Sequence, residues 1–444
     1  MWKRRKRSWR QAVAKTSREP GKSFRGRRSR IGEGQRMRGM NMNLTIGERV
    51  AWYRRRRGLS QEVLAGLIGR TADWLGKIEN NRIELDRLSV IKSLADVLDV
   101  SLGDLLAEPS LVEWSTESGM ETVPTLRAAL MEYRAITSLG IPGAKATAPD
   151  LDELRQETAK LWTAYQASRF GYVTGQLPGL LGRAQAAADS LNGHAQEEAR
   201  GLLGLTYQLA ATQLTKLGET DLAWIAADRG LSVVRPVGDP AITGSLFRSV
   251  SHALLSTGRY QDAVRLTTDA ADYLDQHLTD AGPELLSVYG TLLLGGSVAA
   301  ARANDAGTAR TFLTAADQAA ARLGKDANYL WTAFGPTNVA IHRVATAGEL
   351  GNVQVAIDLG PSLDTAGLPM ERRVRHALEV SRAYGAWNRQ DEALAVLLDA
   401  EQMAPEQVRH HYLGRQLVLT WIRQQRGKPS SELVGLARRL HVLD

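Results

Sequence analysis

Residues 58–82, GLSQEVLAGLIGRTADWLGKIENNR, have the pattern of two short helices joined by a tight turn. Ser60 is suited to cap the first helix, because its hydroxyl can accept a hydrogen bond from the free N–H groups of the opening turn. Gly69 and Arg70 interrupt the apolar pattern, so we expect the first helix to end there. Four apolar residues before this break recur at the three- and four-residue steps of one helix face: Val63, Leu64, Leu67 and Ile68.

The second helix of this stretch begins after Thr71, which can cap it as Ser60 caps the first. Leu75 and Ile78 are three residues apart and form its inward side. The side chains that then point outward are Ala72, Asp73, Trp74 and Lys77. A short helix that is held from behind, with a free front near its N-terminus, has the geometry that enters a DNA major groove.

The composition limits the class of protein. A chain of 444 residues with 43% hydrophobic residues should contain two or more domains with ample cores. The absence of Cys excludes disulfides, thiolate metal sites and Cys nucleophiles. No apolar run approaches the length of a membrane span, and the basic N-terminus lacks the apolar segment of a secretory signal. We therefore expect a cytoplasmic protein without a membrane partner.

The net charge of +8 is unevenly distributed along the chain. Residues 1–40 carry 15 Lys and Arg but only two acidic residues, so their net charge is +13 and that of residues 41–444 is −5. The high pI is therefore weak evidence that the folded part binds DNA. We expect residues 1–40 to be disordered. They are a basic arm that contacts phosphates, a solvated tail, or an extension preceding a start at Met37, Met40 or Met42.

Residues 44–109 should form five short helices. Thr45 and Glu48 form a capping box, in which the threonine caps forward and the glutamate reaches back. A second capping signal, with aspartate in the place of glutamate, precedes the last helix at Ser101 and Asp104. Apolar stripes mark the first and fourth helices at Ile46, Val50 and Tyr53, and at Leu88, Ile91, Leu94, Ala95 and Leu98.

The segments IGERVAWYRRRRGLSQEVLAGLIG, KIEN and LADVLDVSLGDLL keep a consistent mutual spacing in residues 46–108. This region resembles the lambda-repressor/Cro-type helix-turn-helix, the xenobiotic-response-element (XRE) family. The resemblance implies binding to double-stranded DNA and a structural ion pair between Arg54 and Glu79. It also implies phosphate contacts from Gln61 and Arg82. Together with the outward side of the second helix, the DNA-binding set is Gln61, Thr71, Ala72, Asp73, Trp74, Lys77 and Arg82.

Three residues depart from the usual pattern of this family. Arg70 replaces an apolar turn residue, and Gly76 interrupts the recognition helix at a cost of about 1 kcal/mol relative to Ala. Asp73 places a negative charge on the side that faces phosphates, although a carboxylate can read cytosine N4. The alternative to a DNA reader is therefore a helix-turn-helix fold that only packs against partners.

The remainder of the chain is predicted to be helical. Pro124, Pro142, Gly143 and Pro149 mark residues 110–150 as a linker, with a helix around residues 126–138. In residues 151–444 a helix-to-helix turn, GRYQDA at residues 258–263, has weaker copies that begin at Gly218, Asn304, Gly348 and Asn388. These copies are 40 to 46 residues apart and resemble a degenerate tetratricopeptide (TPR)-like α-solenoid. The alternative is an unrelated array of helical hairpins.

The sequence contains no phosphate-binding loop, no H-E-x-x-H and no G-x-S-x-G, and the adjacent His410 and His411 diverge on a helix. We therefore expect no enzyme, no cofactor and no metal. In a TPR-like array the first helix of each hairpin lines the concave side. Polar residues on that side could hold a peptide or an anionic ligand: Gln208, Arg248, His252, Asn338, His342 and Arg382. The most distinctive segment there is WTAFGPTNVAIHRV at residues 331–344.

The sequence thus predicts an all-α protein, in which a five-helix lambda-repressor-like domain precedes a TPR-like solenoid. The resemblance implies a homodimeric transcriptional regulator that associates with the nucleoid when bound to DNA and senses a peptide or small effector. One alternative is a TPR-like interaction scaffold whose helix-turn-helix is vestigial. Another is an unrecognised enzyme, which a deep pocket with clustered acids would support.

Overall fold

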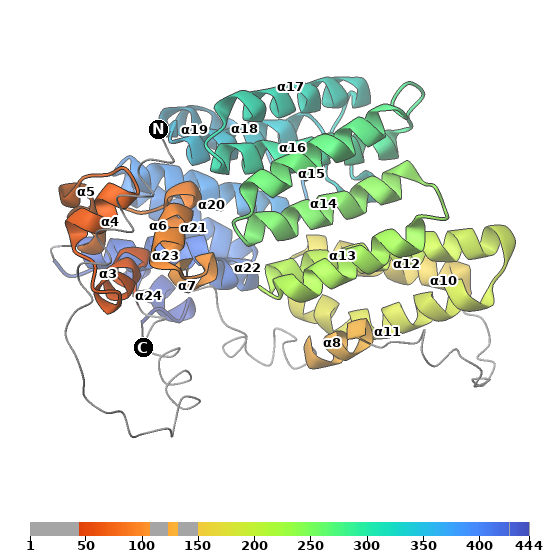
Figure 1. Cartoon of the computed structure of the whole chain (residues 1–444), viewed down its shortest axis with the longest axis horizontal. Helices are drawn as coiled ribbons and strands as arrows, with labels where there is room; N and C mark the ends of the chain where they lie inside the picture. The colour runs from red at the N-terminus through yellow and green to blue at the C-terminus, as the bar shows by residue number, and fades with distance from the viewer. Residues whose placement is uncertain (1–43, 107–122, 132–149, 426, 444) are drawn as a thin grey trace, which may run out of the picture. The chain divides into compact units, whose positions relative to one another are not determined.

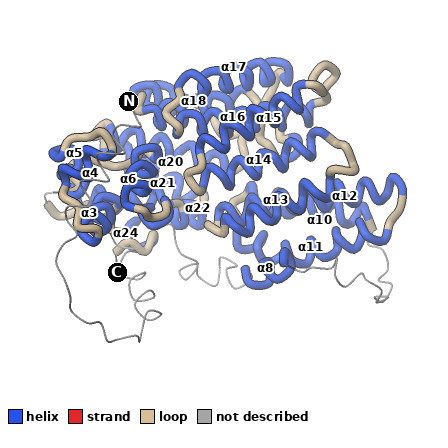
Figure 2. Tube along the Cα trace, viewed as in Figure 1, coloured by secondary structure: helices blue, strands red, loops and turns tan. Residues whose placement is uncertain are grey.

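The computed structural model describes residues 44–106, 123–131 and 150–443, apart from residue 426 and the side chain of His410. The predicted tail at residues 1–40 and most of the predicted linker lie outside this range. The described residues form helices, with one isolated antiparallel bridge between Ala327 and Phe334 (Figure 2). The fold class is therefore all-α, as predicted.

The head of the described chain consists of α3 (Ile46–Arg56), α4 (Gln61–Leu67), α5 (Ala72–Glu79), α6 (Leu88–Leu98) and α7 (Leu102–Leu106). The predicted caps are confirmed. The Thr45 hydroxyl accepts from the Glu48 N–H while the Glu48 carboxylate accepts from the Thr45 N–H. The hydroxyls of Ser60 and Thr71 likewise accept from the third residue of α4 and α5. These local signals fix where the head helices begin.

The prediction for the apolar face of α4 is partly wrong. Leu64 is fully buried, but Val63 and Leu67 are each 50% exposed. Successive residues on a helix are about 100° apart, so a two-turn helix that contacts its neighbours along one narrow line cannot bury all four apolar side chains. The buried neighbour of Leu64 is instead Ala65.

A buried cation that the sequence did not reveal joins the two ends of the head. The guanidinium of Arg49 is fully buried and donates to the backbone oxygens of Leu105 and Leu44, each at 2.6 Å. Burial, with the nearby Arg415, lowers the pKa of Arg49 to about 9. This side chain therefore ties α3 to α7.

The helix in the predicted linker and the helices of the body are located as follows. The helix expected around residues 126–138 is found as α8 (Val123–Met131), with Pro124 in its first turn, where a residue without an N–H is tolerated. Residues 132–149 lie outside the described range. The first body helices are α10 (Leu151–Gln166), α11 (Phe170–Ser190), α12 (Gly193–Lys216), α13 (Thr220–Val234), α14 (Pro240–Ser256), α15 (Tyr260–Asp275), α16 (Pro283–Arg302) and α17 (Ala306–Leu323).

The second half of the body follows the same alternation of paired helices (Figure 1). Consecutive helices pack as antiparallel hairpins, of which α12 with α13 and α16 with α17 are the most extensive. The elements after α17 are η4 (Tyr329–Trp331), α18 (Pro336–Leu350), α19 (Val353–Leu359), η5 (Gly360–Ser362), α20 (Met370–Ala386), α21 (Gln390–Met403), α22 (Pro405–His410), α23 (Tyr412–Gln424) and α24 (Ser431–Arg439).

The turn inside each hairpin has one repeated geometry. A residue with positive φ ends the first helix, and the next residue's N–H bonds to a carbonyl in the helix's last turn, as Arg259 does to Leu254 at 2.9 Å. This is the Schellman arrangement, which satisfies free carbonyls at a helix end. The positive-φ residues are Ser168, Gly218, Gly258, Asn304, Gly351 and Asn388. The helical hairpins of the body therefore share one turn geometry.

Two details of the predicted repeat are corrected. The fourth turn is centred on Gly351 and not on Gly348, so the buried small residue after it is Ala356. Gly348 lies inside α18, where an added Cβ would lie 2.6 Å from a guanidinium nitrogen of Arg382. An additional turn at Ser168 escaped prediction, because serine at this position does not have the glycine or asparagine signature.

The expectation that no segment reaches the length of a membrane span is wrong for α16. This helix is long and apolar enough to cross a membrane, with a mean hydropathy of 1.4 over its most apolar window, of which 83% is buried inside the protein. It lies against α15 and α17 (Figure 1). At Gly290 an added Cβ would lie 1.9 Å from the ring of Phe334. Such close packing is that of a central core helix.

The head packs directly on the body. A continuous set of buried apolar side chains extends from α3 through α7 into the helices α10 to α16. Three polar contacts add to it: the Ile46 N–H donates to Gln416 at 2.9 Å, Arg87 donates to the Glu349 carbonyl at 3.1 Å, and Arg423 pairs with Glu48 at 3.2 Å. The head is therefore oriented by the body and is not only tethered to it.

Candidate functional site

The outward side of α5 is accessible. Leu75 and Ile78 are buried behind it, as predicted, while Thr71, Asp73 and Arg82 are exposed. Ala72, Trp74 and Lys77 are half-buried. Of these predicted DNA-binding residues, three are therefore accessible and three are partly accessible.

Two contacts moderate the unusual residues of this face. Lys77 Nζ lies 2.8 Å from the Asp73 carboxylate one helical turn away, so the aspartate charge is partly neutralised. The guanidinium of Arg70 lies over the Trp74 ring, 5.4 Å from its centroid. Arg70, which replaces the apolar turn residue usual in this family, thus contacts the Trp74 ring.

The ion pair implied by the resemblance is present and buried. Arg54 Nε and Nη2 donate to the two carboxylate oxygens of Glu79 at 2.5 and 2.7 Å, and its Nη1 donates to the Leu59 carbonyl at 2.8 Å. The hydrogen bond to Glu79 raises the pKa of Arg54. Gln61 completes the cluster, because its Nε2 donates to Glu79 at 2.7 Å. The Gln61 amide is therefore engaged inside the head and does not extend outward.

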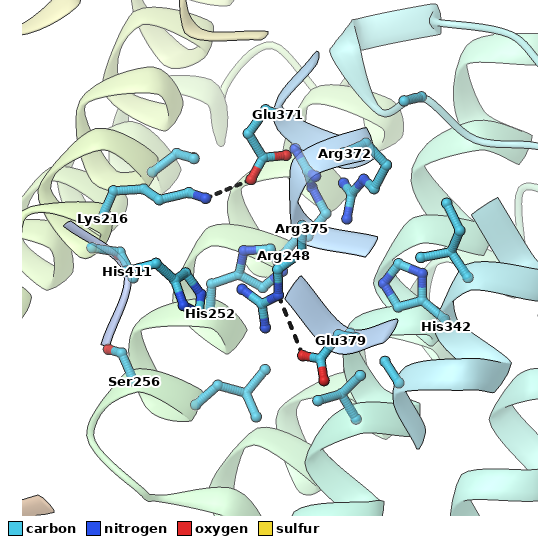
Figure 3. Close-up of a pocket in the computed structure, with 18 of the residues that line it drawn as sticks. Lys216, Arg248, His252, Ser256, His342, Glu371, Arg372, Arg375, Glu379 and His411 are labelled. Carbon is cyan, nitrogen blue, oxygen red and sulfur yellow. Dashed lines mark hydrogen bonds and ion pairs between the residues drawn. The ribbon is translucent and has the colours of Figure 1, made fainter. Parts of the chain in front are cut away.

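A cavity of about 290 Å³ lies inside the described body and is bounded on one side by the head. Its lining comes from α6 and α7 of the head, and from α10, α12, α14, α16, η4, α18, α20 and α23 of the body. Figure 3 shows the polar residues that the body contributes. The cations in this lining are Lys216, Arg248, Arg302, Arg372 and Arg375, and the carboxylates are Glu349, Glu371 and Glu379. Five cations against three carboxylates leave two positive charges in excess.

Each carboxylate of the cavity has a cationic partner. Glu371 pairs with Lys216, and Glu379 pairs with Arg375 at 3.6 Å (Figure 3) and with Arg382, outside the lining, at 2.8 Å. Glu349 pairs with Arg302 at 3.1 Å. Burial alone would raise the pKa of Glu371, but Lys216 and Arg372 hold it well below its usual range. Burial and Arg302 have the same opposing effects on Glu349, whose pKa is also lowered. Both carboxylates are therefore ionised at neutral pH.

Three histidines line the same cavity and are neutral. Burial, with the neighbouring Arg248 or Arg375, lowers the pKa values of His252 and His411 well below 6.5, and burial with Arg372 lowers that of His342 to about 3. The Nδ1 of His342 lies 2.9 Å from the Asn338 carbonyl, and that of His411 accepts from the Leu413 N–H at 3.2 Å. A neutral His411 therefore presents its Nε2–H as a donor.

The loop before α18 adds a strained wall to the cavity. Leu330, Trp331 and Ala333 have φ values of 46°, 54° and 50°, a region that L-residues rarely occupy. Trp331 stacks on Trp162 with ring centroids 5.2 Å apart, and Trp331 and Ala333 both line the cavity. Strained backbone of this kind concentrates at ligand sites.

The predicted groove residues fall into two groups. Arg248, His252 and His342 line the cavity. Gln208, Asn338 and Arg382 do not. All three are buried, with Asn338 donating to the Ala333 carbonyl at 2.8 Å and Arg382 pairing with Glu379 at 2.8 Å. Their placement in the groove was therefore wrong.

Sequence reasoning missed several lining residues. Lys216, Arg372 and Arg375 are three of the five cations in the lining, and Trp162 is one of its aromatic residues. The run ERRVR at residues 371–375 was the available signal, since two of its arginines are three positions apart and so share a helix face. Among the described residues no group of three or more His, Asp or Glu is arranged to hold a metal ion.

A comparison with protein families matches residues 45–108 to a family described as a helix-turn-helix domain. A search of the curated proteins found no match. The head is therefore a helix-turn-helix domain, and this class of fold suggests a DNA-binding regulator. The cavity belongs to the part of the chain that the family match does not cover.

Proposed function

We propose that the protein is a transcriptional regulator of the XRE type, in which the head reads DNA and the TPR-like body binds an effector. The observation that carries the proposal is the exposed face of α5, which Leu75, Ile78 and the buried Arg54–Glu79 pair hold from behind. This arrangement leaves Thr71, Lys77 and Arg82 free to approach a duplex. A regulator of this kind works in the cytoplasm, on the nucleoid.

The proposed active form is a homodimer. One head of five short helices offers few base contacts, and a symmetric pair would place two recognition helices about one DNA turn, or 34–36 Å, apart. The specificity of two half-sites would then compensate for the atypical Asp73 and Gly76. A palindromic binding site is the expected signature.

The cavity supports binding more than catalysis. A pocket with clustered carboxylates would favour an enzyme, but the three glutamates here are each paired with a cation. A general acid or base works best with a pKa near the operating pH. The lowered pKa values of Glu349, Glu371 and the three histidines do not meet that condition.

Genome-wide mapping of the binding sites of the tagged full chain tests the proposal. We expect an enriched palindromic sequence, to which the purified protein binds in a mobility-shift assay. Lys77→Ala should weaken this binding about tenfold and lower its salt dependence, because one phosphate or base contact is lost. Lys160→Ala, which removes an equal charge from an exposed position on α10, should have no effect.

If no sequence is enriched and Lys77→Ala leaves the cellular function intact, the protein is a TPR-like scaffold with a vestigial helix-turn-helix. Sedimentation of the protein–duplex complex tests the proposed homodimer separately, because it gives the number of chains bound to each palindrome. Two chains per palindrome are expected, and one chain per palindrome would refute the dimer.

A further inference from the structure

Two arginines of the cavity, Arg248 and Arg372, make no direct ion pair with a carboxylate of the described residues. Arg248 is only 6% exposed, and within the described residues neither it nor Arg372 makes a hydrogen bond or an ion pair. Figure 3 labels Arg248 near the centre of the cluster, next to the label of Arg375. These two account for the excess of two positive charges in the lining. A buried charge without a partner is costly, so its retention indicates a ligand that supplies the counter-charge.

The electrostatic surroundings agree with an anionic ligand. Burial and the neighbouring Arg372 lower the pKa of Arg248 to about 10, which still leaves it charged at neutral pH. The indole N–H of Trp162 is also buried in the lining and lacks an acceptor among the described residues. The cavity therefore offers two guanidinium groups and a neutral donor to an acceptor-rich group.

Much of the remaining lining is apolar or aromatic. It includes the rings of Trp162, Tyr165, Trp331 and Tyr412, and aliphatic side chains from the body and from the head: Leu88, Leu102, Leu106, Leu217, Leu255, Val298 and Ile341. A fully charged ligand such as inorganic phosphate would make no contact with these apolar side chains. An apolar ligand would leave the two arginines unpaired.

We propose that this cavity binds a small amphiphilic anion, with its carboxylate or phosphate on Arg248 and Arg372 and its apolar part against the leucines of the head. The inference rests on the proposed function and names the chemical class of its effector. The volume of about 290 Å³ is at the small end of ligand pockets and fits one small molecule or the terminal residues of a peptide. A small acid and the C-terminal end of a peptide have the same chemistry in this respect, since both carry an anionic group on an apolar body.

The same geometry connects the ligand to the head. Leu88 belongs to α6, and Leu102 and Leu106 belong to α7, so a ligand in the cavity contacts the helix-turn-helix domain itself. Leu102 also lies against the α14–α15 turn at Gly258. A ligand that fits one position of α7 better than another changes the orientation of the head through direct contact.

Titration of the full chain with the fluorescent amphiphilic anion 8-anilinonaphthalene-1-sulfonate tests the inference. We expect saturable binding at one site per chain. Arg248→Met and Arg372→Met should each weaken it at least tenfold, while Arg248→Lys should retain part of it. Arg373→Met is the matched control on α20, because Arg373 does not line the cavity, and its affinity should equal that of the wild type. Circular dichroism shows whether each variant is folded.

Competition identifies the ligand class and its source. Octanoate should displace the probe, and octanol at the same concentration should not. The dipeptide N-acetyl-Leu-Leu, tested with a free and with an amidated carboxyl group, shows whether the site accepts the C-terminal end of a peptide. Displacement of the probe by octanoate or by the dipeptide with the free carboxyl group supports the proposal. Absence of saturable binding, equal binding by the Arg248 and Arg372 variants, or equal displacement by octanol would overturn it.

The failure of this inference can be separated from the failure of the proposed function. If the probe does not bind but the protein still binds its DNA site in a mobility-shift assay, the proposed ligand class is wrong and the proposed regulator function is supported. If the probe binds but no DNA is bound, the proposed regulator function is wrong and the proposed ligand site is supported.

Discussion

Two buried arginines of this protein have opposite environments. Arg54 in the head is held by both oxygens of Glu79 and by the Leu59 carbonyl. Arg248 in the body is equally buried, yet it has no ion-pair partner among the described residues. The first cation contributes to the fold, because its charge is satisfied within the protein. The second weakens the fold and is compensated only when an anion binds.

The largest predicted effect is that of breaking the satisfied pair. Arg54→Met should lower the free energy of unfolding by about 3–5 kcal/mol, because it leaves the Glu79 carboxylate buried without its partner. Arg248→Met should cost less than about 1 kcal/mol or stabilise the ligand-free protein, since it removes an unpaired buried charge. Urea unfolding of the two variants measures both changes. An equal loss in both variants would contradict the distinction between the two arginines.

The packing of the head gives the next largest effect. In Gly47→Ala the added Cβ would lie 2.1 Å from the Ile78 backbone oxygen, so α3 and α5 must separate. We expect a loss of about 3 kcal/mol in stability and loss of DNA binding, with the body still folded. Gly66→Ala, on the exposed side of α4 with open space around it, is the control and should gain up to about 1 kcal/mol. Thermal unfolding and a mobility shift decide the result, and a neutral Gly47→Ala would refute the close approach.

The contact of head and body should depend on pH through Glu84, which lies between α5 and α6 with its carboxylate next to Gly385 of α20. Burial and the nearby Asp86 raise the pKa of Glu84 to about 8 from its ordinary 4.5. Glu84 is therefore protonated in the folded protein at neutral pH but ionised in the unfolded chain. The contribution of Glu84 to the free energy of unfolding is therefore fully present below pH 4.5. It is lost progressively as the pH rises to about 8.

Glu84→Gln should consequently raise the melting temperature by several degrees at pH 8 and by less at pH 5.5. The measurement is the melting temperature between pH 5.5 and 8.5, with Glu62→Gln at an exposed position of α4 as the control. An equal shift at both pH values would show that Glu84 is not the group that titrates.

The smallest effect concerns the recognition face. Asp73→Asn removes a negative charge beside Lys77 and should raise the affinity for DNA a few-fold, with a steeper salt dependence. Its cost in stability should be a few tenths of a kcal/mol, because an exposed i,i+4 pair is lost. Asp189→Asn at an exposed position of α11 is the charge-matched control for the mobility shift. A loss of affinity would instead identify the Asp73 carboxylate as a base reader.

The head was largely predictable because its signals are local. Ser60, Thr71 and the Thr45–Glu48 box each act within three residues, and the structure contains all of them. Short-range patterns also explain the errors. Val63 and Leu67 have the correct spacing for a buried face, but only the packing of α4 decides which residues of a short helix reach the core.

The cavity could be predicted only in part, because it is assembled over long distances in the chain. Arg248 and His252 were found through their shared helix face. The Lys216–Glu371 pair joins residues 155 positions apart, and the wall contributed by Leu102 and Leu106 depends on how the head packs on the body. The left-handed backbone conformation at Trp331 could not be predicted from the sequence, because tryptophan rarely adopts it.

The most direct test of the central claim, that the head and the cavity are coupled, is the dissociation constant of 8-anilinonaphthalene-1-sulfonate measured with and without a saturating duplex of the enriched DNA site. Coupling between two binding sites is reciprocal, so a ligand that contacts α6 and α7 must bind differently when DNA fixes the head. The predicted result is a change of at least threefold in the dissociation constant. The same dissociation constant in both conditions would contradict the account.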